Sequence, residues 1–269
     1  MKKITKTRLA SLRGKSINLR YSIIEYTKLK GSFLGSCLSC LDLLIYLYTD
    51  FLKINKKNIY SKSRDIFILS KGHAAPALYA VLLDKGLISK KLFLSDDTYW
   101  HPEKTIKGVD FQTGALGHGL PVSVGIAKYY QINKINKWVV VMIGDGELNE
   151  GSIWESFLIS KNWKLGNLII IIDKNKFQAN DKTNKVLNLG SLEKKISSFD
   201  LDLIKVNGHD FKDIHKKISS LKKNNKPKVI IANTKRNFGI LSIQNKKEFW
   251  YVAKSEKKLK QFIVNIPQS

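Results

Sequence analysis

Residues 138–151 read WVVVMIGDGELNEG and carry the strongest fold signal of the sequence. The run Trp138–Ile143 is continuously apolar and largely β-branched, which is typical of a parallel strand covered on both faces. Gly144, Asp145 and Gly146 follow directly, so a carboxylate stands at the carboxyl edge of the predicted strand. Parallel α/β sheets bind ligands at this edge, and the flanking glycines let the backbone approach one closely.

The dinucleotide-binding fingerprint does not explain this segment. Asn149 occupies the place where its third glycine should fall, and Asp145 alone would repel a pyrophosphate. A divalent cation removes the objection, because Mg²⁺ binds carboxylate, amide or carbonyl, and phosphate oxygens together. Asn175 ends the next predicted strand, one strand-helix-strand crossover after Asp145, so both side chains can reach one ion.

Strand and helix signals alternate along the rest of the chain. The predicted strands are Asp65–Leu69, Trp138–Ile143, Asn167–Ile172, Leu203–Val206 and Val229–Asn233. The predicted helices are Leu9–Tyr26, Leu38–Phe51, Ala74–Lys85 and Ser152–Trp163. This alternation predicts an α/β fold, a doubly wound parallel sheet flanked by helices. No Gly-, Ser- or Pro-rich linker interrupts the chain, so we expect one domain over residues 1–269.

The net charge of +25 raises the possibility of nucleic-acid binding. Only five of the 47 basic residues are arginine, the residue expected where phosphate is held bidentately. The lysines are spread along the chain rather than clustered. We therefore interpret the charge as a solvated surface and expect no nucleic-acid partner.

Two further features point to a soluble protein. The start, Met1 to Arg20, is basic without an apolar segment, and the longest aliphatic run, Leu168–Ile172, is too short to span a membrane. Cys37 and Cys40 form a lone CxxC, and a zinc ribbon would need a second pair. We interpret both cysteines as small buried helix residues, and we expect a cytoplasmic protein without membrane contact.

The ordered motifs of the chain resemble the amino-terminal half of transketolases over nearly the whole length. Gly144–Asp145–Gly146 followed by Asn175 looks like the thiamine-diphosphate motif of that family. Further similar segments are Ile68–Ala80, His101–Glu103, Gln112–Leu120, Asn207–Asp210 and Pro227–Thr234. The resemblance implies a thiamine-diphosphate-binding fold, with thiamine diphosphate and Mg²⁺ (or Ca²⁺) as cofactors.

The resemblance also implies roles for single residues. The metal ligands would be Asp145, Asn175 and the backbone carbonyl of Phe177. The implied cofactor-binding residues are His73, Gly114, Leu116, Gly144, Asp145, Gly146, Glu150, Asn175 and Phe177. His73 would contact the diphosphate, His101 the donor sugar, and Glu150 a carboxylate network linking paired active sites, and these three are the implied catalytic residues. We interpret His118 and His209 as structural.

Two positions depart from the family pattern. Phe33 stands where the family usually has a histidine, and Trp250 is placed at the position of a second histidine. Neither phenylalanine nor tryptophan can transfer protons as a general acid or base. The loop Lys235–Gly239 is also altered. The cofactor site is retained in sequence, whereas the substrate-handling positions are changed.

The resemblance ends at Ser269, where members of the family continue into further domains. One of those domains supplies the glutamate that activates the cofactor, so we expect a separate carboxyl-half subunit in an α2β2 assembly. The expected activity is transfer of a two-carbon ketol unit from a ketose sugar to an aldehyde acceptor. Two alternatives stay open, namely ketol or acyl transfer to an unusual, for example nucleotide-linked, sugar, and a non-catalytic regulatory homologue.

Overall fold

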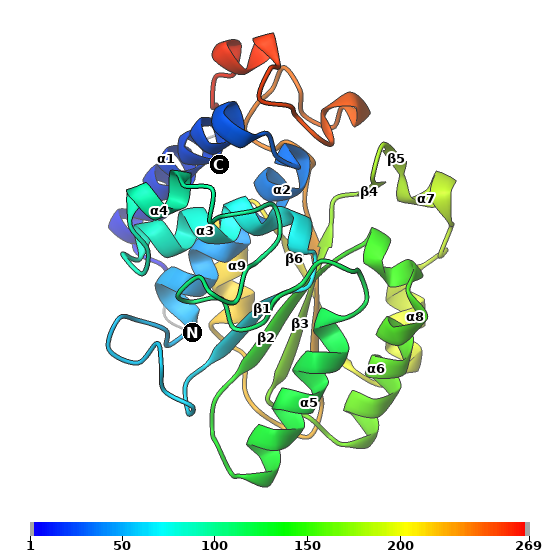
Figure 1. Cartoon of the computed structure of the whole chain (residues 1–269). Coiled ribbons are helices and arrows are strands. Elements are labelled where there is room, and N and C mark those ends of the chain that lie inside the picture. The colour runs from blue at the N-terminus through cyan, green and yellow to red at the C-terminus, as the bar shows by residue number, and fades with distance from the viewer. Residues whose placement is uncertain (1–2, 267–269) are drawn as a thin grey trace.

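The computed structural model describes residues 3–266 and is built on a parallel sheet with helices on both faces (Figure 1). The strands of this sheet are β1 (Ile66–Leu69), β2 (Val139–Gly144), β3 (Leu168–Lys174), β6 (Asp202–Asn207) and β7 (Lys228–Asn233). They are all parallel and lie in the order β1-β2-β3-β7-β6. Every predicted strand is present, and the predicted doubly wound α/β class is confirmed.

One face of the sheet is covered by the helices that begin the chain and by one later helix. This layer contains α1 (Lys6–Lys30), α2 (Leu34–Tyr46) with a π-helical extension (Leu47–Phe51), α3 (Ala75–Asp84), α4 (Lys90–Leu94) and α9 (Phe211–Ile218). Val140, Met142 and Ile171 project into this layer, and each is fully buried. Successive strand residues point to opposite faces, so their neighbours must pack on the other side.

The opposite face is covered by α5 (Gly119–Ile132), α6 (Gly151–Asn162) and α8 (Leu192–Ser198). Val139, Val141 and Ile170 pack against these helices and have no exposed surface. Burial on both faces explains why the central strands are uninterrupted apolar runs. Helix α5 was not among the predicted helices, although its sequence follows the predicted glycine-rich loop.

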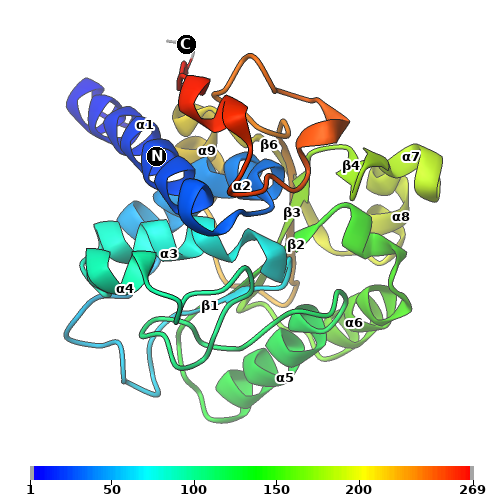
Figure 2. The same ribbon diagram turned by 45° about the horizontal axis from the view of Figure 1, so that its top comes forward.

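The chain leaves β3 and β7 toward opposite faces of the sheet. After β3 it forms a small hairpin, β4 (Phe177–Gln178) and β5 (Asp181–Lys182), followed by α7 (Thr183–Val186) and then α8. After β7 it crosses to the layer of α1 and α2, including the short helices Lys247–Phe249 and Lys257–Gln261 (Figure 2). Between these two segments lies a crevice at the carboxyl edge of the sheet, lined by residues that include Asp145, Asn175 and Thr234. Ligands of α/β folds bind at this edge.

Helix α2 passes through the middle of the first layer. Over the described residues, Leu34–Phe51 is the one helical stretch with the length and hydropathy of a membrane span, and 83% of it is buried inside the protein. Cys37 and Cys40 lie on this helix as free, fully buried thiols. Burial raises the pKa of Cys40 to about 12, so the thiol stays protonated and unreactive. Both cysteines behave as core residues, as predicted.

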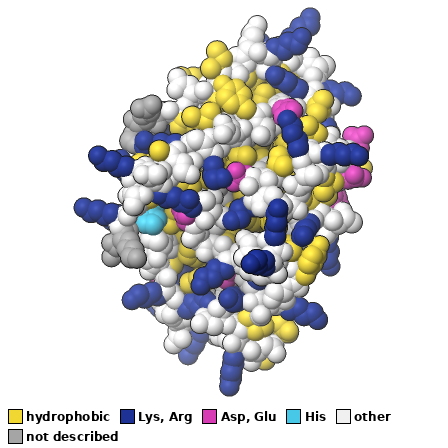
Figure 3. Space-filling view, turned by 90° about the vertical axis from the view of Figure 1, so that its left-hand side faces the viewer, with side chains coloured by type: hydrophobic (Ala, Val, Ile, Leu, Met, Phe, Trp, Pro, Cys, Tyr) yellow, Lys and Arg dark blue, Asp and Glu magenta, His cyan; other side chains and the backbone are white. Residues whose placement is uncertain are grey.

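Basic side chains are distributed over the surface. In the view of Figure 3, Lys and Arg side chains project from all parts of one face, with apolar and a few acidic groups between them. On this face they are scattered rather than gathered into a stripe. Their distribution agrees with the solvated surface expected from the spread of lysine along the sequence.

Candidate active site at the carboxyl edge of the sheet

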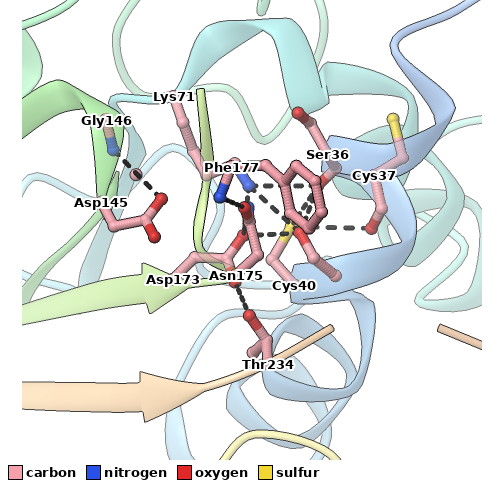
Figure 4. A network of polar contacts seen from close by, with 12 residues as sticks. Ser36, Cys37, Cys40, Lys71, Asp145, Gly146, Asp173, Asn175, Phe177 and Thr234 are labelled. Carbon is pink, nitrogen blue, oxygen red and sulfur yellow. Dashed lines mark hydrogen bonds and ion pairs between the residues drawn. The ribbon is translucent and has the colours of Figure 1, made fainter. Parts of the chain in front are cut away.

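Asp145 and Asn175 follow neighbouring strands at the carboxyl edge, and the structure brings them together. Both are 7% exposed. The Asp145 carboxylate accepts the N–H of Gly146 at 3.0 Å and that of Lys176 at 2.6 Å, which ties the end of β2 to the loop after β3. The Asn175 side-chain oxygen accepts the N–H of Phe177 at 2.9 Å. Asn175 and Phe177 therefore belong to one tight turn, and this turn lies beside the Asp145 carboxylate (Figure 4).

The electrostatics around Asp145 favour a cation. Burial and the neighbouring Asp173 carboxylate raise the pKa of Asp145 to about 7. No cluster of three or more His, Cys, Asp or Glu side chains suited to a metal ion occurs within residues 3–266. An ion at this place would thus need amide, carbonyl and phosphate oxygens besides Asp145, which is the ligand set that Mg²⁺ accepts.

A buried ion pair that was not predicted lies beneath these residues. Lys71 and Asp173 are in contact, and their side chains are at most 1% exposed. Asp173 also accepts hydrogen bonds from Ser39 at 2.6 Å and from Thr234, while Lys71 donates to the carbonyl of Ser36 at 3.1 Å (Figure 4). Burial alone would lower the pKa of Lys71, but the Asp173 carboxylate outweighs it and raises that pKa. Asp173 therefore keeps the Lys71 ammonium group charged and in place behind the carboxyl edge of the sheet.

The predicted histidines His73 and His101 lie close enough to each other, and His73 to Lys71, for their charges to interact. Burial, reinforced by Lys71 and His101, lowers the pKa of His73 to about 3, so this imidazole is neutral at physiological pH. Burial also lowers the pKa of His101. A Cβ placed on Gly114 would lie 3.9 Å from the His101 ring, so the glycine-rich loop passes directly over His101.

The glycine-rich loop is held by Thr113 and Glu147. Thr113 donates to the Leu69 carbonyl at 2.6 Å, and the buried Glu147 carboxylate accepts the N–H groups of Gly117 at 2.9 Å and Gly144 at 3.1 Å. Glu147 thereby joins the loop to the GDG turn and was missed in the sequence. Two of its partners, Gly117 and Ser70, come from distant segments, and no local motif marks it.

The remaining predicted residues lie at or near the protein surface. Glu150 is exposed at the start of α6, and its side chain lies beside Gly117 rather than in the turn that holds Asp145. Leu116 is half-buried in the loop, and its carbonyl lies 2.9 Å from Nδ1 of His118. Exposure of Glu150 is compatible with a role at a contact with another chain. His118 makes the local backbone contact expected of a structural residue.

Arg236 is a further residue that sequence reasoning did not assign to the site. It is 2% exposed and donates from Nη2 to the Ala179 carbonyl at 2.7 Å, whereas Nε and Nη1 have no hydrogen-bond partner among the described residues. Its guanidinium lies 4.5 Å from the centre of the Phe177 ring. Burial lowers the pKa of Arg236 to about 10, against the opposing charge of Asp145, so it stays cationic. A buried cation with two free donors is costly unless an anion binds it.

Three aromatic rings surround Phe33, the position at which the family resemblance implies a histidine. Phe33 lies 4.9 Å from Trp250, 5.4 Å from Tyr251 and 5.9 Å from Trp100, between ring centres. The Phe33 ring is also 5.8 Å from that of His73, in an edge-to-face arrangement. We call Phe33, Trp100, Trp250 and Tyr251 the aromatic cluster. It puts an apolar wall next to a neutral histidine.

Residues 19–262 match the family model described as transketolase, thiamine diphosphate binding domain. The chain belongs to this family. The resemblance seen in the sequence is confirmed, and so are thiamine diphosphate as the cofactor and the class of thiamine-diphosphate-dependent, transketolase-like transferases.

Relatives of two lengths are similar to this transketolase domain. It is 35% identical over 246 residues to a subunit of the apulose-4-phosphate transketolase of Actinobacillus succinogenes, covering 88% of each chain. It is 33% identical to 6-deoxy-6-sulfo-D-fructose transketolase subunit SqwG of a Clostridium species, covering 82% of each. Human transketolase is 32% identical, and there the match covers 91% of this chain but 40% of the human protein.

Solved transketolases share the fold. The enzyme from Campylobacter jejuni superposes with a TM-score of 0.82 at 29% identity, covering 96% of this chain and 44% of that one. The enzyme from Leishmania mexicana gives 0.83 at 25% identity, with 93% and 40% covered. The observed sheet is therefore the transketolase thiamine-diphosphate fold.

The carboxyl edge fits the diphosphate group of this cofactor. Asp145 and Asn175 offer oxygens to a metal ion, and Arg236 offers two buried N–H groups to a phosphate. Gly146 leaves no room for a side chain, because a Cβ there would lie 2.8 Å from Gln178. Carboxylate, amide and guanidinium together are the donor set that a metal diphosphate requires.

Proposed function

We propose that the chain is the thiamine-diphosphate-binding subunit of a split transketolase-like enzyme, active with a second polypeptide that carries the carboxyl half. The enzyme transfers a two-carbon ketol unit from a ketose donor to an aldehyde acceptor. The single observation that carries this proposal is the buried Arg236, which has two N–H groups unsatisfied by the described residues and lies near enough to Asp145 for the charges of the two side chains to interact. It is supported by relatives of matching length that are named as transketolase subunits.

The protein residues bind and orient the cofactor. Asp145, Asn175 and the Phe177 carbonyl would hold Mg²⁺ (or Ca²⁺), which neutralises the diphosphate. Neutral His73 would hydrogen-bond to the diphosphate without changing its charge. Gly144 and Gly146 would allow the close approach. When bound, thiamine diphosphate supplies the carbanion chemistry.

His101, Gly114, Leu116 and Glu150 complete the proposed site. Gly114 and Leu116 lie on the loop that passes over His101, where the body of the cofactor and the donor sugar would be positioned. Exposed Glu150 would meet its carboxylate partner on another chain. We therefore propose one cofactor-binding domain over residues 1–269 in an α2β2 assembly located in the cytoplasm.

The aromatic cluster supports a second candidate with the same cofactor and different substrates. Ordinary sugar phosphates would meet phenylalanine and tryptophan where the family resemblance implies two histidines. A ketol or acyl transfer to an unusual sugar, including a nucleotide-linked one, accommodates this apolar wall. The cofactor chemistry is the same in both candidates.

The experiment is reconstitution of the enzyme with the carboxyl-half polypeptide. The complex is supplied with Mg²⁺, thiamine diphosphate, a ketose-phosphate donor and a panel of aldehyde acceptors, and products two carbons longer are detected by mass spectrometry. Transfer by the complex and none by either subunit supports the split enzyme. Cofactor binding without transfer to any acceptor supports the regulatory alternative, and full turnover by this chain alone contradicts the proposal.

A further inference from the structure

A buried polar chain links α1 and α2 to the loop after β6. Arg20 donates from Nη1 and Nη2 to the two oxygens of Asp42, each at 2.9 Å, and the side chains are 0% and 1% exposed. Nδ1 of His209 lies 2.9 Å from the second Asp42 oxygen. These three side chains are none of the proposed cofactor contacts. A buried, bidentate pair of this kind is rigid, so it can fix the orientation of a third group.

His209 connects this rigid pair to the segment Lys235–Gly239. The N–H of Lys235 donates to Nε2 of His209 at 2.9 Å, so Nε2 is the acceptor and the ring proton resides on Nδ1, facing Asp42. The ring of Phe238 stacks on that of His209, with centres 3.6 Å apart. Both ring nitrogens and one ring face of His209 are thereby used.

Arg20 holds the other end of the same segment. Its Nε donates to the Phe238 carbonyl at 2.9 Å, and its guanidinium lies 5.2 Å from the Phe238 ring centre. Gly239 adopts φ +90°, and a Cβ there would lie 2.7 Å from Arg20 Nε. This position therefore requires glycine for both its backbone angle and its space.

Arg236 lies between these two anchors. Its Nε and Nη1 are unsatisfied within the described chain, and its side chain packs against Gly35 of α2 as well as the Phe177 ring. Two free N–H groups bind an anion tightly only if the guanidinium is already held in place. Otherwise the loss of side-chain conformational entropy on binding would weaken the affinity. The anchors on both sides of Arg236 provide this orientation.

We propose that Arg20, Asp42 and His209 are positioning residues that hold the segment Lys235–Gly239 so that Arg236 presents Nε and Nη1 to the diphosphate of the cofactor. The inference rests on the proposed function in one respect, the identity of the anion. His209 touches no reacting group, and it acts through the backbone of Lys235. Its effect must therefore depend on Arg236 being present.

The test is a double-mutant cycle on cofactor affinity in the assembled complex. Affinities for thiamine diphosphate with Mg²⁺ and for thiamine without phosphate are measured by calorimetry for wild type, His209→Phe, Arg236→Gln and the double variant. His209→Phe keeps a ring for Phe238 to stack on and loses both hydrogen bonds. We expect thiamine diphosphate affinity to fall by roughly tenfold or more in each single variant, with thiamine unaffected. The double variant should be no weaker than Arg236→Gln.

Two further variants separate positioning from folding. His209→Gln keeps an acceptor for the Lys235 N–H and should recover most of the affinity. His215→Phe removes another histidine, hydrogen-bonded at 3.1 Å to Tyr46 at the carboxyl end of α2, and should bind as wild type does. Thermal melting without cofactor identifies any variant that fails to fold.

The outcomes distinguish the two proposals. A wild-type complex that does not bind thiamine diphosphate refutes the proposed function. Wild-type binding with unchanged affinity in His209→Phe, or additive losses in the double variant, overturns the positioning role. If His209→Phe does not fold, Phe238→Leu, which removes the ring that stacks on His209, takes its place in the same cycle with Arg236→Gln, with the same outcomes expected.

Discussion

Asp145 is a buried carboxylate that faces a second buried carboxylate, Asp173. We predict that Asp145→Asn abolishes metal-dependent binding of thiamine diphosphate, because an amide of the same shape cannot neutralise Mg²⁺. The loss of affinity should exceed the roughly 10- to 100-fold that is typical when a residue that only hydrogen-bonds to a metal ligand is mutated. Calorimetric titration with and without a chelator measures it.

The control for this variant is Asp181→Asn, which changes a carboxylate of the nearby hairpin that accepts the N–H of Lys182. It should bind as the wild type does. Without metal or cofactor, Asp145→Asn should melt at a higher temperature than wild type, because a buried charge without a cation destabilises the fold. Equal affinity of wild type with and without chelator would remove the metal from the assignment.

We expect Phe33 to limit which substrates the assembled enzyme can use. The ring lies edge-on to His73, and its neighbours are Trp100, Trp250 and Tyr251. A sugar phosphate that needs a polar partner here loses about 1–3 kcal/mol per missing hydrogen bond. We predict slow turnover of conventional ketose phosphates by the wild-type complex and faster turnover by Phe33→His.

Comparison of kcat/KM for the two proteins with the same donor and acceptor checks this prediction. Phe51→His changes a phenylalanine on the π-helical extension, paired with Trp138 at 6.0 Å and remote from the crevice, and should give no gain. Turnover of the wild-type complex at ordinary transketolase rates would show that the rings do not exclude sugar phosphates.

Helices α1 and α2 are joined to each other by the Arg20–Asp42 pair. Burial alone would raise the pKa of Asp42 above its ordinary 3.8, but Arg20 and His209 outweigh it and hold the pKa well below that value. Ionised Asp42 therefore stabilises the fold fully above about pH 4, and this contribution is lost as the pH falls further. Asp42→Asn should cost about 3–5 kcal/mol at pH 7, because it leaves a buried guanidinium without its counter-charge.

Urea unfolding at pH 7 and pH 3 measures this difference. The gap between wild type and Asp42→Asn should be largest at pH 7 and shrink at pH 3. Asp84→Asn breaks the partly exposed pair with Lys15 and should cost less than about 1 kcal/mol. An equal, small loss in both variants would mean that the Arg20–Asp42 pair contributes no more than a surface ion pair.

The sequence predicted the elements that carry their own signal. The strands β2 and β3 were found because burial on both faces demands apolar residues without interruption, as in Leu168–Ile172. The hairpin β4–β5 and helix α7 were not, since they are a few polar residues long and depend on the turn at Asn175. Asp145 and His73 were also predicted from the sequence, because each lies within a contiguous motif.

Other site residues could not be found, because their significance arises from tertiary contacts. Lys71 and Asp173 are 102 positions apart and become an ion pair only when β1 and β3 join one sheet. In the sequence, Arg236 is only one residue of an altered loop. That its Nε and Nη1 are buried without hydrogen-bond partners among the described residues is a property of the folded structure. Charged residues are read as surface residues in a sequence unless a motif says otherwise.

At the scale of the whole molecule, several large apolar side chains are exposed on α5, α6 and their ends. We call the exposed large apolar residues of α5, α6 and their ends the α5/α6 surface: Tyr129, Ile132, Leu158, Ile159 and Trp163. They lie on two adjacent helices that cover one face of the sheet. Apolar groups that gather on one surface mark contacts with other chains. Exposed Glu150 directly precedes α6, so the proposed carboxylate network would begin at the amino end of the same helix.

We predict that the α5/α6 surface is covered when the enzyme assembles. Leu158 is 59% exposed, so Leu158→Asp should leave the melting temperature of the isolated chain nearly unchanged. In the presence of the carboxyl-half subunit, the same substitution should shift the assembly toward smaller species and lower its activity, because a carboxylate would be desolvated in the contact. Tyr60→Asp is the matched control, since Tyr60 is 81% exposed in the loop before β1 and away from this surface. Light scattering of both variants decides the matter: identical masses for Leu158→Asp and Tyr60→Asp complexes would show that this apolar surface stays in contact with solvent.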